Sequence, residues 1–329
     1  MTQHAGSGPA LPVRRRRHAL LLFLTGLWGL CTAFTLLCMV LPTMPNTLFF
    51  SVSVLAYTYN PFLLVSAVLG GVLLSLARKR RLRVPSIITG VLTLGVLVGV
   101  AVPTARLADV AAENDVDLSV GQLFQGPEGG LSKPSATATY NRVAGQDLKM
   151  DVWRPENQAR ASNAALIYVY GGGFSSGDRM SRPPYFQHLT SQGITVFAMD
   201  YRLSTPTDPS YDKAAGDVKC AVGWVHRHAD RYGVDTDRVA ISGGSAGGNL
   251  ALLAAYSDDS DAISPSCDAK DTSVRAVVDF YGPPDLTQLY TGTPSIPVKA
   301  SLRQYLGGTP DEQPDRYRSL SPVTYIDAK

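Results

Sequence analysis

The first 105 residues contain no aspartate and no glutamate, although nine lysines and arginines lie among them. From His18 to Ala77, sixty consecutive residues lack every ionised Asp, Glu, Lys or Arg side chain. This run is too long for one membrane span of about 20 residues. The basic residues form two clusters, Arg14–Arg17 and Arg78–Arg83, beside apolar runs. They therefore indicate membrane orientation rather than nucleic-acid binding, and we expect no nucleic-acid partner.

We predict three transmembrane helices, at about residues 19–41, 48–77 and 84–105, after a disordered basic N-terminus over residues 1–18. Residues 42–46 supply a turn, and Asn60-Pro61 either kinks the second helix or marks its start. A signal peptide is the alternative for the first span, but that span is too long and two more follow. Basic clusters favour the cytoplasm, so we predict a multi-pass protein of the cell membrane, with the lipid bilayer as partner and everything after the third span outside.

Cysteines are few, and the four present, Cys31, Cys38, Cys220 and Cys267, lack the spacing of a zinc site. We expect neither a metal nor an organic cofactor. Cys220 and Cys267 can pair only where the compartment is oxidising and the fold brings them together. Two separate buried thiols are the alternative, and the sequence leaves both open.

After a predicted linker over residues 106–136, residues 137–329 have the pattern of a folded domain. A hairpin over 139–153 precedes apolar strands that alternate with helices. The strands are expected at 165–170, 194–199, 239–242 and 274–280, and helices at 184–192 and 211–232. This alternation predicts an α/β domain with a doubly wound, mostly parallel sheet.

The most informative stretch is a short buried strand, a glycine turn and a helix over residues 239–256. Gly243-Gly244-Ser245-Ala246-Gly247 fits the pattern G-x-S-x-G, in which a serine sits on a strained strand-to-helix turn. The helix that follows would place its N-terminus under Ser245, where amides favour developing negative charge. A flexible Gly/Ser loop is the alternative for the pentapeptide taken alone.

A second glycine motif follows the strand at 165–170. Gly171-Gly172-Gly173 lets backbone N–H groups turn toward a ligand without steric hindrance, as in the glycine loop of esterases. A phosphate-binding loop is the alternative, but the pattern G-x-x-x-x-G-K is absent. Serine chemistry needs such donors for its oxyanion, together with a base and a group that orients the base.

Several motifs in order make residues 138–329 resemble α/β-hydrolases of the bacterial esterase/lipase group, near the hormone-sensitive-lipase-like and BD-FAE branches. The resemblance implies that Ser245 is the nucleophile and that the amides of Gly172, Gly173 and Ala246 form the oxyanion hole. Tyr170 departs from the family's histidine, which bears on loop geometry and substrate preference. The motifs are Tyr170–Phe174, Asp200–Leu203, Asp217 with Ala221 and Trp224, Gly243–Gly248, Tyr281–Leu286 and Ser321-Pro322.

No histidine follows Ser245, although this fold orders its triad as serine, acid, histidine. His4 and His18 fall on the predicted cytoplasmic side. We interpret His188, His226 and His228 as surface or capping residues, with the last two facing solvent. Asp279 and Asp285 fit turn or capping roles better than that of the acid. Asp217 is expected to hold the loop at residues 200–203 by hydrogen bonds.

The strands that deliver the acid and the histidine are therefore expected to be missing, because the sequence is truncated before the last strands. We predict a membrane-anchored serine hydrolase that cleaves small-molecule carboxylic esters through an acyl-enzyme on Ser245 and is inactive as residues 1–329. A catalytically dead binding protein of the same fold is the alternative. A serine peptidase is a third option, disfavoured because no propeller domain is recognisable. The acyl and alcohol groups and the oligomeric state are left open.

Overall fold

The computed structural model describes residues 13–41, 46–114, 119, 121, 133–157, 161–257, 262–293 and 295–326. The chain forms two compact units, Met1–Gly126 and Pro127–Lys329. Most of the predicted linker, the first twelve residues and most of the predicted turn at 42–46 lie outside the described residues.

The first unit is helical. Its elements are α1 (Val13–Val40), α2 (Thr47–Thr58), the 3-10 turn η1 (Asn60–Phe62), α3 (Leu63–Lys79) and α4 (Arg83–Glu113). The prediction of disorder over residues 1–18 was wrong for residues 13–18, which belong to α1. The prediction of a linker from residue 106 was wrong for residues 106–113, since α4 continues to Glu113. Ala and Leu in that stretch are strong helix formers and carry the helix past the apolar run.

The predicted second span, 48–77, is two helices rather than one. Pro61 has no N–H to donate and cannot continue the turns of α2, so the chain passes through η1 before α3 begins. The side chain of Asn60 is buried and donates from Nδ2 to the carbonyl of Gly99 on α4 at 2.9 Å. This hydrogen bond fixes the break against a neighbouring helix. Asn60-Pro61 therefore marks the start of the span.

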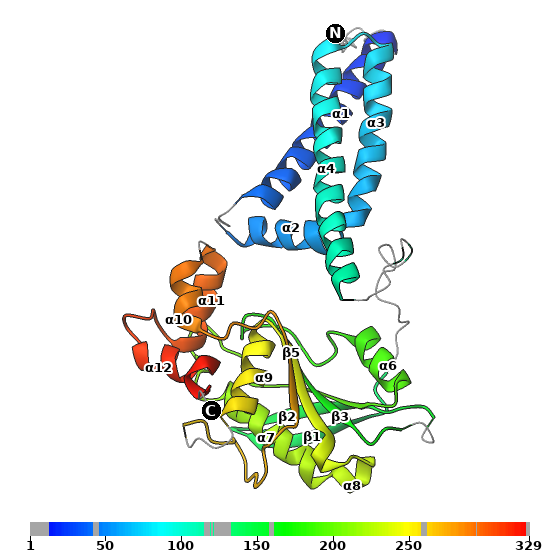
Figure 1. Cartoon of the computed structure of the whole chain (residues 1–329). Coiled ribbons are helices and arrows are strands. Elements are labelled where there is room, and N and C mark those ends of the chain that lie inside the picture. The colour runs from blue at the N-terminus through cyan, green and yellow to red at the C-terminus, as the bar shows by residue number, and fades with distance from the viewer. Residues whose placement is uncertain are drawn as a thin grey trace, which may run out of the picture. The chain divides into compact units, whose positions relative to one another are not determined.

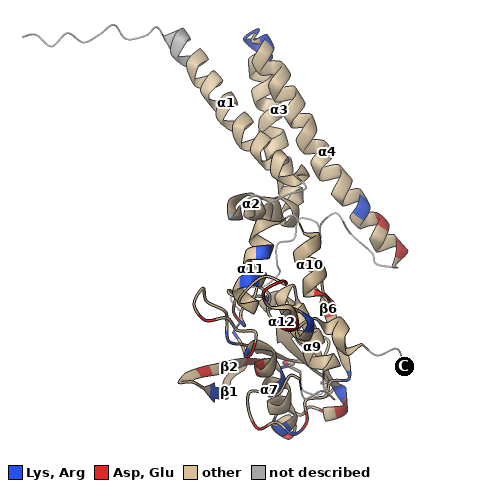
Figure 2. Cartoon of the chain, turned by 90° about the vertical axis from the view of Figure 1, so that its left-hand side faces the viewer, with Lys and Arg blue, Asp and Glu red and all other residues tan. Residues whose placement is uncertain are grey.

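Three helices of this unit are long and apolar enough to cross a membrane: His18–Val40, Asn60–Lys79 and Arg83–Glu113. Leu48–Thr58 is a shorter apolar helix. In Figure 2 the long middle parts of α3 and α4 carry no Lys, Arg, Asp or Glu, and basic residues gather at the turn between these two helices. The lengths and charge pattern fit the prediction of three spans by composition.

The second unit is built on a six-stranded mixed sheet with strand order β1-β2-β4-β3-β5-β6 (Figure 1). β1 and β2 form the predicted hairpin, and β2 pairs antiparallel with β4. The pairs β4–β3, β3–β5 and β5–β6 are parallel. The predicted mostly parallel sheet is thus present. The strands span Ala136–Val143, Gln146–Trp153, Ala165–Val169, Thr195–Met199, Val239–Gly244 and Ala276–Phe280, from β1 to β6.

Helices cover both faces of this sheet. Tyr168 of β3 contacts Phe186 of α6 (Pro183–Ser191), with ring centroids 5.0 Å apart. Phe197 of β4, paired with Ile167, points to the opposite face and contacts Trp224 of α7 (Ala214–Arg227). Neighbouring residues of a strand alternate between faces, so α6 and α7 lie on different sides. The sheet is therefore doubly wound, as predicted.

The remaining helices follow the order of the chain. The predicted helix 211–232 is interrupted, because α7 ends at Arg227 and a short helix, α8, begins after His228. His228 caps the end of α7: its backbone N–H donates to the carbonyl of Trp224 at 3.1 Å, and its Nδ1 lies 2.8 Å from the same carbonyl. The other elements are α8 (Ala229–Tyr232), η3 (Thr236–Arg238), α9 (Ala246–Tyr256), α10 (Leu286–Gly292), α11 (Ile296–Leu306), α12 (Pro314–Ser319) and η4 (Pro322–Tyr325).

A buried ion pair fixes the loop after β4, as predicted for Asp217. Asp217 is fully buried and accepts from the Arg202 side chain at 2.8 and 2.7 Å and from its backbone N–H at 3.0 Å. All three bonds hold the same loop to α7. Removing the carboxylate would leave a partly buried guanidinium unpaired, which typically costs several kcal/mol.

Cys220 of α7 and Cys267 form a disulfide, with Cα atoms 5.5 Å apart. Of the two alternatives left open, the structure favours pairing. The two cysteines are 47 positions apart in the sequence, and the bond links the segment between α9 and β6 to α7.

We expect Cys220→Ser with Cys267→Ser to lower the free energy of unfolding by about 2–4 kcal/mol, because the unfolded chain regains the entropy of the open loop. Urea titration of the wild-type chain and the double variant measures the difference. Cys31→Ser is the matched control, since Cys31 is a free thiol in α1. An equal urea midpoint for the wild type and the double variant would contradict the prediction.

Candidate active site

Ser245 lies at the turn between β5 and α9, with φ 55° and ψ −124°. Positive φ is uncommon for a residue with a side chain, and such strain concentrates at functional sites. The backbone N–H of Ser245 donates to the carbonyl of Phe280 at 2.9 Å, which anchors the strained residue to the end of β6. Its side chain is partly exposed while its neighbours are buried. The G-x-S-x-G segment thus has the strained strand-to-helix turn that was predicted.

Close backbone approach explains two glycines of this turn. A Cβ on Gly243 would strike the backbone of Gly247, the second residue of α9. A Cβ on Gly247 would strike the carbonyls of Val169 and Tyr170, at the end of β3. The turn therefore holds α9 directly against the two central strands and leaves no room for a methyl group.

We expect Gly247→Ala to destabilise the second unit by about 3 kcal/mol, because the atoms in the way are backbone carbonyls that cannot rotate aside. Gly292→Ala is the matched control, since nothing lies within 4 Å of the position its methyl group would take. Thermal unfolding followed by circular dichroism compares the two variants. Equal midpoints would contradict the close packing of α9 on β3.

The loop after β3 brings its glycines against Ser245. A Cβ on Gly171 would lie 3.3 Å from the Cβ of Ser245. Gly172 and Gly173 have φ of 139° and 61°, values that favour glycine. The backbone N–H groups of Gly172, Gly173 and Ala246 have no hydrogen-bond acceptor within the described part of the chain. Unpaired amides in a loop beside a serine are the kind of donor that an oxyanion requires.

Hydrogen bonds behind the loop fix the peptide that carries the Gly173 N–H. The carbonyl of Gly172 accepts from the backbone of Ser175 and Ser176 at 3.2 and 3.1 Å, and from the Ser176 hydroxyl at 2.9 Å. In a trans peptide the C=O and the next N–H point in opposite directions. Holding the Gly172 carbonyl toward Ser176 therefore turns the Gly173 N–H to the other side.

Helix α11 supports the same loop. Ser301 donates from its hydroxyl to the carbonyl of Gly173 at 2.6 Å. Phe174 stacks on Tyr305 with ring centroids 3.8 Å apart, and the Tyr305 side chain is fully buried. Neither Ser176 nor Ser301 was identified from the sequence. Ser301 lies 128 residues from Gly173 and carries no sequence signal of this contact, whereas Ser176 is only four residues from the Gly172 carbonyl that it bonds.

The fold of the loop itself requires glycine at position 172. A Cβ on Gly172 would strike the carbonyl oxygen of Ser176, behind the loop. The glycine is required because the loop folds back on itself there, and a side chain would displace the whole loop.

The carboxylates near the turn accept hydrogen bonds from backbone N–H groups, in the turn and capping roles that were predicted. Asp279 accepts from the N–H of Gly282 at 2.8 Å, and Asp285 caps α10 through the N–H of Gln288 at 2.9 Å. Burial raises the pKa of Asp279, and the hydrogen bond from Gly282 opposes that shift. Neither contact involves a histidine.

Two histidines of this unit, His226 and His228, lie at the end of α7, away from Ser245. His226 stands near the end of α7, and its Nε2 lies 2.9 Å from the carbonyl of Ser273, just before β6 begins. Ser245 follows the other end of the parallel strands. The prediction that His226 faces solvent was wrong, since its side chain is 8% exposed. His228 stacks on Trp224, with ring centroids 4.1 Å apart, and His188 is exposed on α6.

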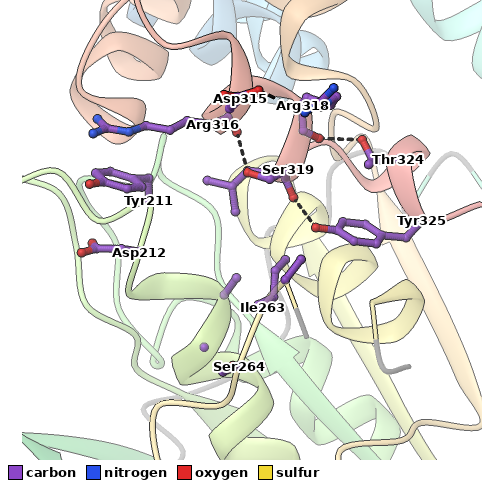
Figure 3. Close-up of a pocket in the computed structure, with 14 residues that line it drawn as sticks. Tyr211, Asp212, Ile263, Ser264, Asp315, Arg316, Arg318, Ser319, Thr324 and Tyr325 are labelled. Atoms are coloured by element: carbon purple, nitrogen blue, oxygen red, sulfur yellow. Dashed lines mark hydrogen bonds and ion pairs between the residues drawn. The ribbon is translucent and has the colours of Figure 1, made fainter. Parts of the chain in front are cut away.

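A pocket of about 620 Å³ lies elsewhere in this unit, between the start of α7 and the elements α12 and η4. In Figure 3, Tyr211, Arg316 and Tyr325 line it, and Tyr325 donates to the carbonyl of Ser319 at 2.8 Å. Ser245 does not line this pocket. The pocket therefore does not serve the serine turn.

The strained serine, its glycine loop and the doubly wound sheet define this unit as an α/β-hydrolase. The BD-FAE family model matches residues 150–329, and the chain belongs to that family. This confirms the resemblance drawn from the motifs.

Similar proteins include esterases. The chain is 33% identical over 186 residues to the probable carboxylic ester hydrolase LipM of Mycobacterium tuberculosis, covering 56% of this chain and 43% of LipM. It is 31% identical over 189 residues to esterase LipQ of the same organism, covering 55% of this chain and 43% of LipQ. The chain thus spans less than half the length of these relatives. The native structure of esterase Est2 from Thermogutta terrifontis aligns with a TM-score of 0.48 and 26% identity, covering 59% of this chain and 66% of Est2.

Proposed function

We propose that the protein is a membrane-anchored serine hydrolase that cleaves small-molecule carboxylic esters, with Ser245 as nucleophile. The observation that carries the proposal is the strained Ser245 at the start of α9, next to three amides without an internal acceptor. The esterase relatives support the same reaction class. Neither a metal nor a cofactor enters this chemistry.

In the proposed reaction the Ser245 hydroxyl oxygen attacks the ester carbonyl carbon and its proton passes to a base. The carbonyl oxygen becomes an oxyanion that accepts hydrogen bonds from the amides of Gly172, Gly173 and Ala246. Collapse of the tetrahedral intermediate expels the alcohol, which takes up the proton, and leaves an acyl group on Ser245. Water then attacks the acyl-enzyme, which releases the acid and restores the serine.

Within the described residues no hydrogen bond joins the Ser245 side chain to a base. No histidine follows Ser245 in the sequence, and His226 and His228 lie against the carbonyls of Ser273 and Trp224. Strand β6 is an edge strand with Val278 and Phe280 43% and 40% exposed, a surface that further strands could cover. A catalytically dead binding protein is the second candidate, and the same lack of a base favours it.

A single covalent turnover tests the nucleophile. The chain is incubated with 4-nitrophenyl acetate, quenched with acid and digested, and the peptides are analysed by mass spectrometry. Acetylation of the hydroxyl of Ser245 is expected, and the Ser245→Ala variant should lack it. Acetyl groups found only on other residues would overturn the assignment.

For topology we propose that the N-terminus is cytoplasmic and the hydrolase unit extracytoplasmic. The support comes from three apolar helices with basic residues at one turn, and from the Cys220–Cys267 disulfide, which persists in oxidising compartments.

We expect alkaline phosphatase fused after Lys329 to be active, because it needs an oxidising compartment, and a β-galactosidase fusion at the same point to be inactive. Fusions after Arg81, at the turn between α3 and α4, should give the opposite pair of results. An active β-galactosidase after Lys329 would place the unit in the cytoplasm.

A further inference from the structure

Two side chains next to the serine turn are not used by the proposed reaction. Tyr281 follows β6 and has φ 49°, a left-handed value that is strained for an aromatic residue. Its side chain is 72% exposed, yet its hydroxyl lies only 3.2 Å from the position of a Cβ on Gly244. The strained backbone therefore sets a phenol directly over the residue that precedes Ser245.

Arg182 is held at this phenol. Its Nη2 donates to the Tyr281 hydroxyl at 3.1 Å, although the two residues are 99 positions apart. Among the residues that the structure describes, no carboxylate lies within 4 Å of the Arg182 guanidinium. Arg179, three residues before Arg182, is paired with both Asp151 and Asp200, at 2.8 and 2.6 Å. Arg182 thus brings an unbalanced positive charge to the serine turn.

The surface below Arg182 is aromatic. Phe280 is paired with Gly244 across the sheet, and Tyr185 of α6 contacts both Phe280 and Tyr168, with ring centroids 6.1 Å apart in each pair. Burial raises the pKa of Tyr168, and the nearby charge of Arg182 opposes that shift. The site therefore combines an apolar wall with one cation at its end, beside the candidate nucleophile.

Electrostatics at this point favour an anion. The N-terminus of α9 and the unpaired amides of the glycine loop add positive partial charge to that of Arg182. The acids of the surrounding segments have other contacts: Asp178 accepts from the N–H of Met180, Asp200 is paired with Arg179, and Asp279 accepts from Gly282 on the face of the sheet that carries α9. A carboxylate matches the planar fork of a guanidinium, which can bind it through two parallel hydrogen bonds.

We propose that Arg182, oriented by Tyr281, binds a free carboxylate on the ester substrate, so that the preferred substrates are monoesters of dicarboxylic acids or esters of hydroxy acids. This inference rests on the proposed esterase function and names the substrate class of the same site. The apolar wall of Tyr185 and Phe280 would pack against the chain between the carboxylate and the scissile ester.

Binding tests the proposal without turnover. In a Ser245→Ala background, isothermal titration calorimetry compares monoethyl glutarate with ethyl 5-methylhexanoate, in which an isopropyl group replaces the carboxylate. We expect the charged ester to bind roughly tenfold more tightly, because a bidentate charged contact is worth about that factor. The preference should fall in 1 M NaCl, since salt screens an exposed charge.

Arg182→Gln should remove the preference by weakening the binding of the charged ester roughly tenfold. Arg238→Gln is the matched control: it removes the same charge from an exposed arginine just before β5, at the strand end opposite Ser245. Tyr281→Phe, which removes only the hydroxyl that orients Arg182, should reduce the preference several-fold. Unfolding midpoints of all variants check that each is folded.

Equal binding of the two esters would overturn the proposal, as would a preference that persists in Arg182→Gln or no binding of the charged ester. These results leave the esterase proposal to be decided separately, by acetylation of Ser245 with the neutral 4-nitrophenyl acetate. Loss of that acetylation with a retained Arg182-dependent preference would instead describe a carboxylate-binding protein.

Discussion

Purified residues 1–329 are expected to hydrolyse 4-nitrophenyl butyrate far more slowly than a complete serine esterase. Without a base the Ser245 hydroxyl stays protonated, and its attack on the ester is slow. In other serine hydrolases that have lost a triad member, the oxyanion hole and binding leave roughly 10³–10⁴-fold over water. We expect a residual rate of that order, set by the amides of Gly172, Gly173 and Ala246.

Added imidazole should restore part of the rate. It supplies the missing kind of base, so the rate should rise with imidazole concentration above the reaction of imidazole with the ester alone. Ser245→Ala in the same buffer is the matched control, and it should show only that background. A longer form that carries an acid and a histidine after Lys329 should need no imidazole and should react with a fluorophosphonate probe.

Two results would contradict this prediction. Fast hydrolysis by residues 1–329 without imidazole would mean that a base lies within them or comes from a second copy, and His188→Ala would be the first variant to test. An imidazole effect of equal size in Ser245→Ala would mean that the serine is not the nucleophile.

The sequence predicted the elements of the second unit well, for a physical reason. Each strand of the parallel part is short, apolar and bounded by glycine or polar turns, as buried strands must be. The residues of β3, β4 and β5 are almost all buried in the structure. Helix ends were less predictable. The break at Asn60-Pro61 is marked by its proline, whereas α7 ends at Arg227, before His228, with neither proline nor glycine to mark the end.

The glycines and the serine of the site could be placed from sequence because their spacing is local. The side chains that hold these residues in place could not be predicted from the sequence. Ser301 reaches Gly173 from 128 residues away, and Arg182 reaches Tyr281 from 99 residues away. The pairing of Cys220 and Cys267 could not be predicted either, because it depends on how the segment before β6 packs against α7. Residues that act through the fold become visible only when the fold is known.

The glycine loop carries the second large expected effect. In a form that turns over, with its own histidine or with imidazole, Gly172→Val should lower the rate by roughly 10²–10³-fold. The Cβ would strike the Ser176 carbonyl, so the peptides at Gly172 and Gly173 would rotate and their amides would leave the oxyanion. The steady-state rate constant, measured beside the thermal midpoint, checks this.

Ser176→Ala tests whether the hydrogen bonds that position the loop affect the rate, without adding a bulky side chain. It removes one of the three donors to the Gly172 carbonyl and leaves the two backbone donors in place. We therefore expect a loss of about tenfold in rate and little change in stability, since each remaining bond still restrains the same peptide. Ser191→Ala is the matched control, because its hydroxyl donates to the His188 carbonyl at the end of α6. If Gly172→Val is folded and turns over at the wild-type rate, these amides do not hold the oxyanion, and other donors must lie at Ser245.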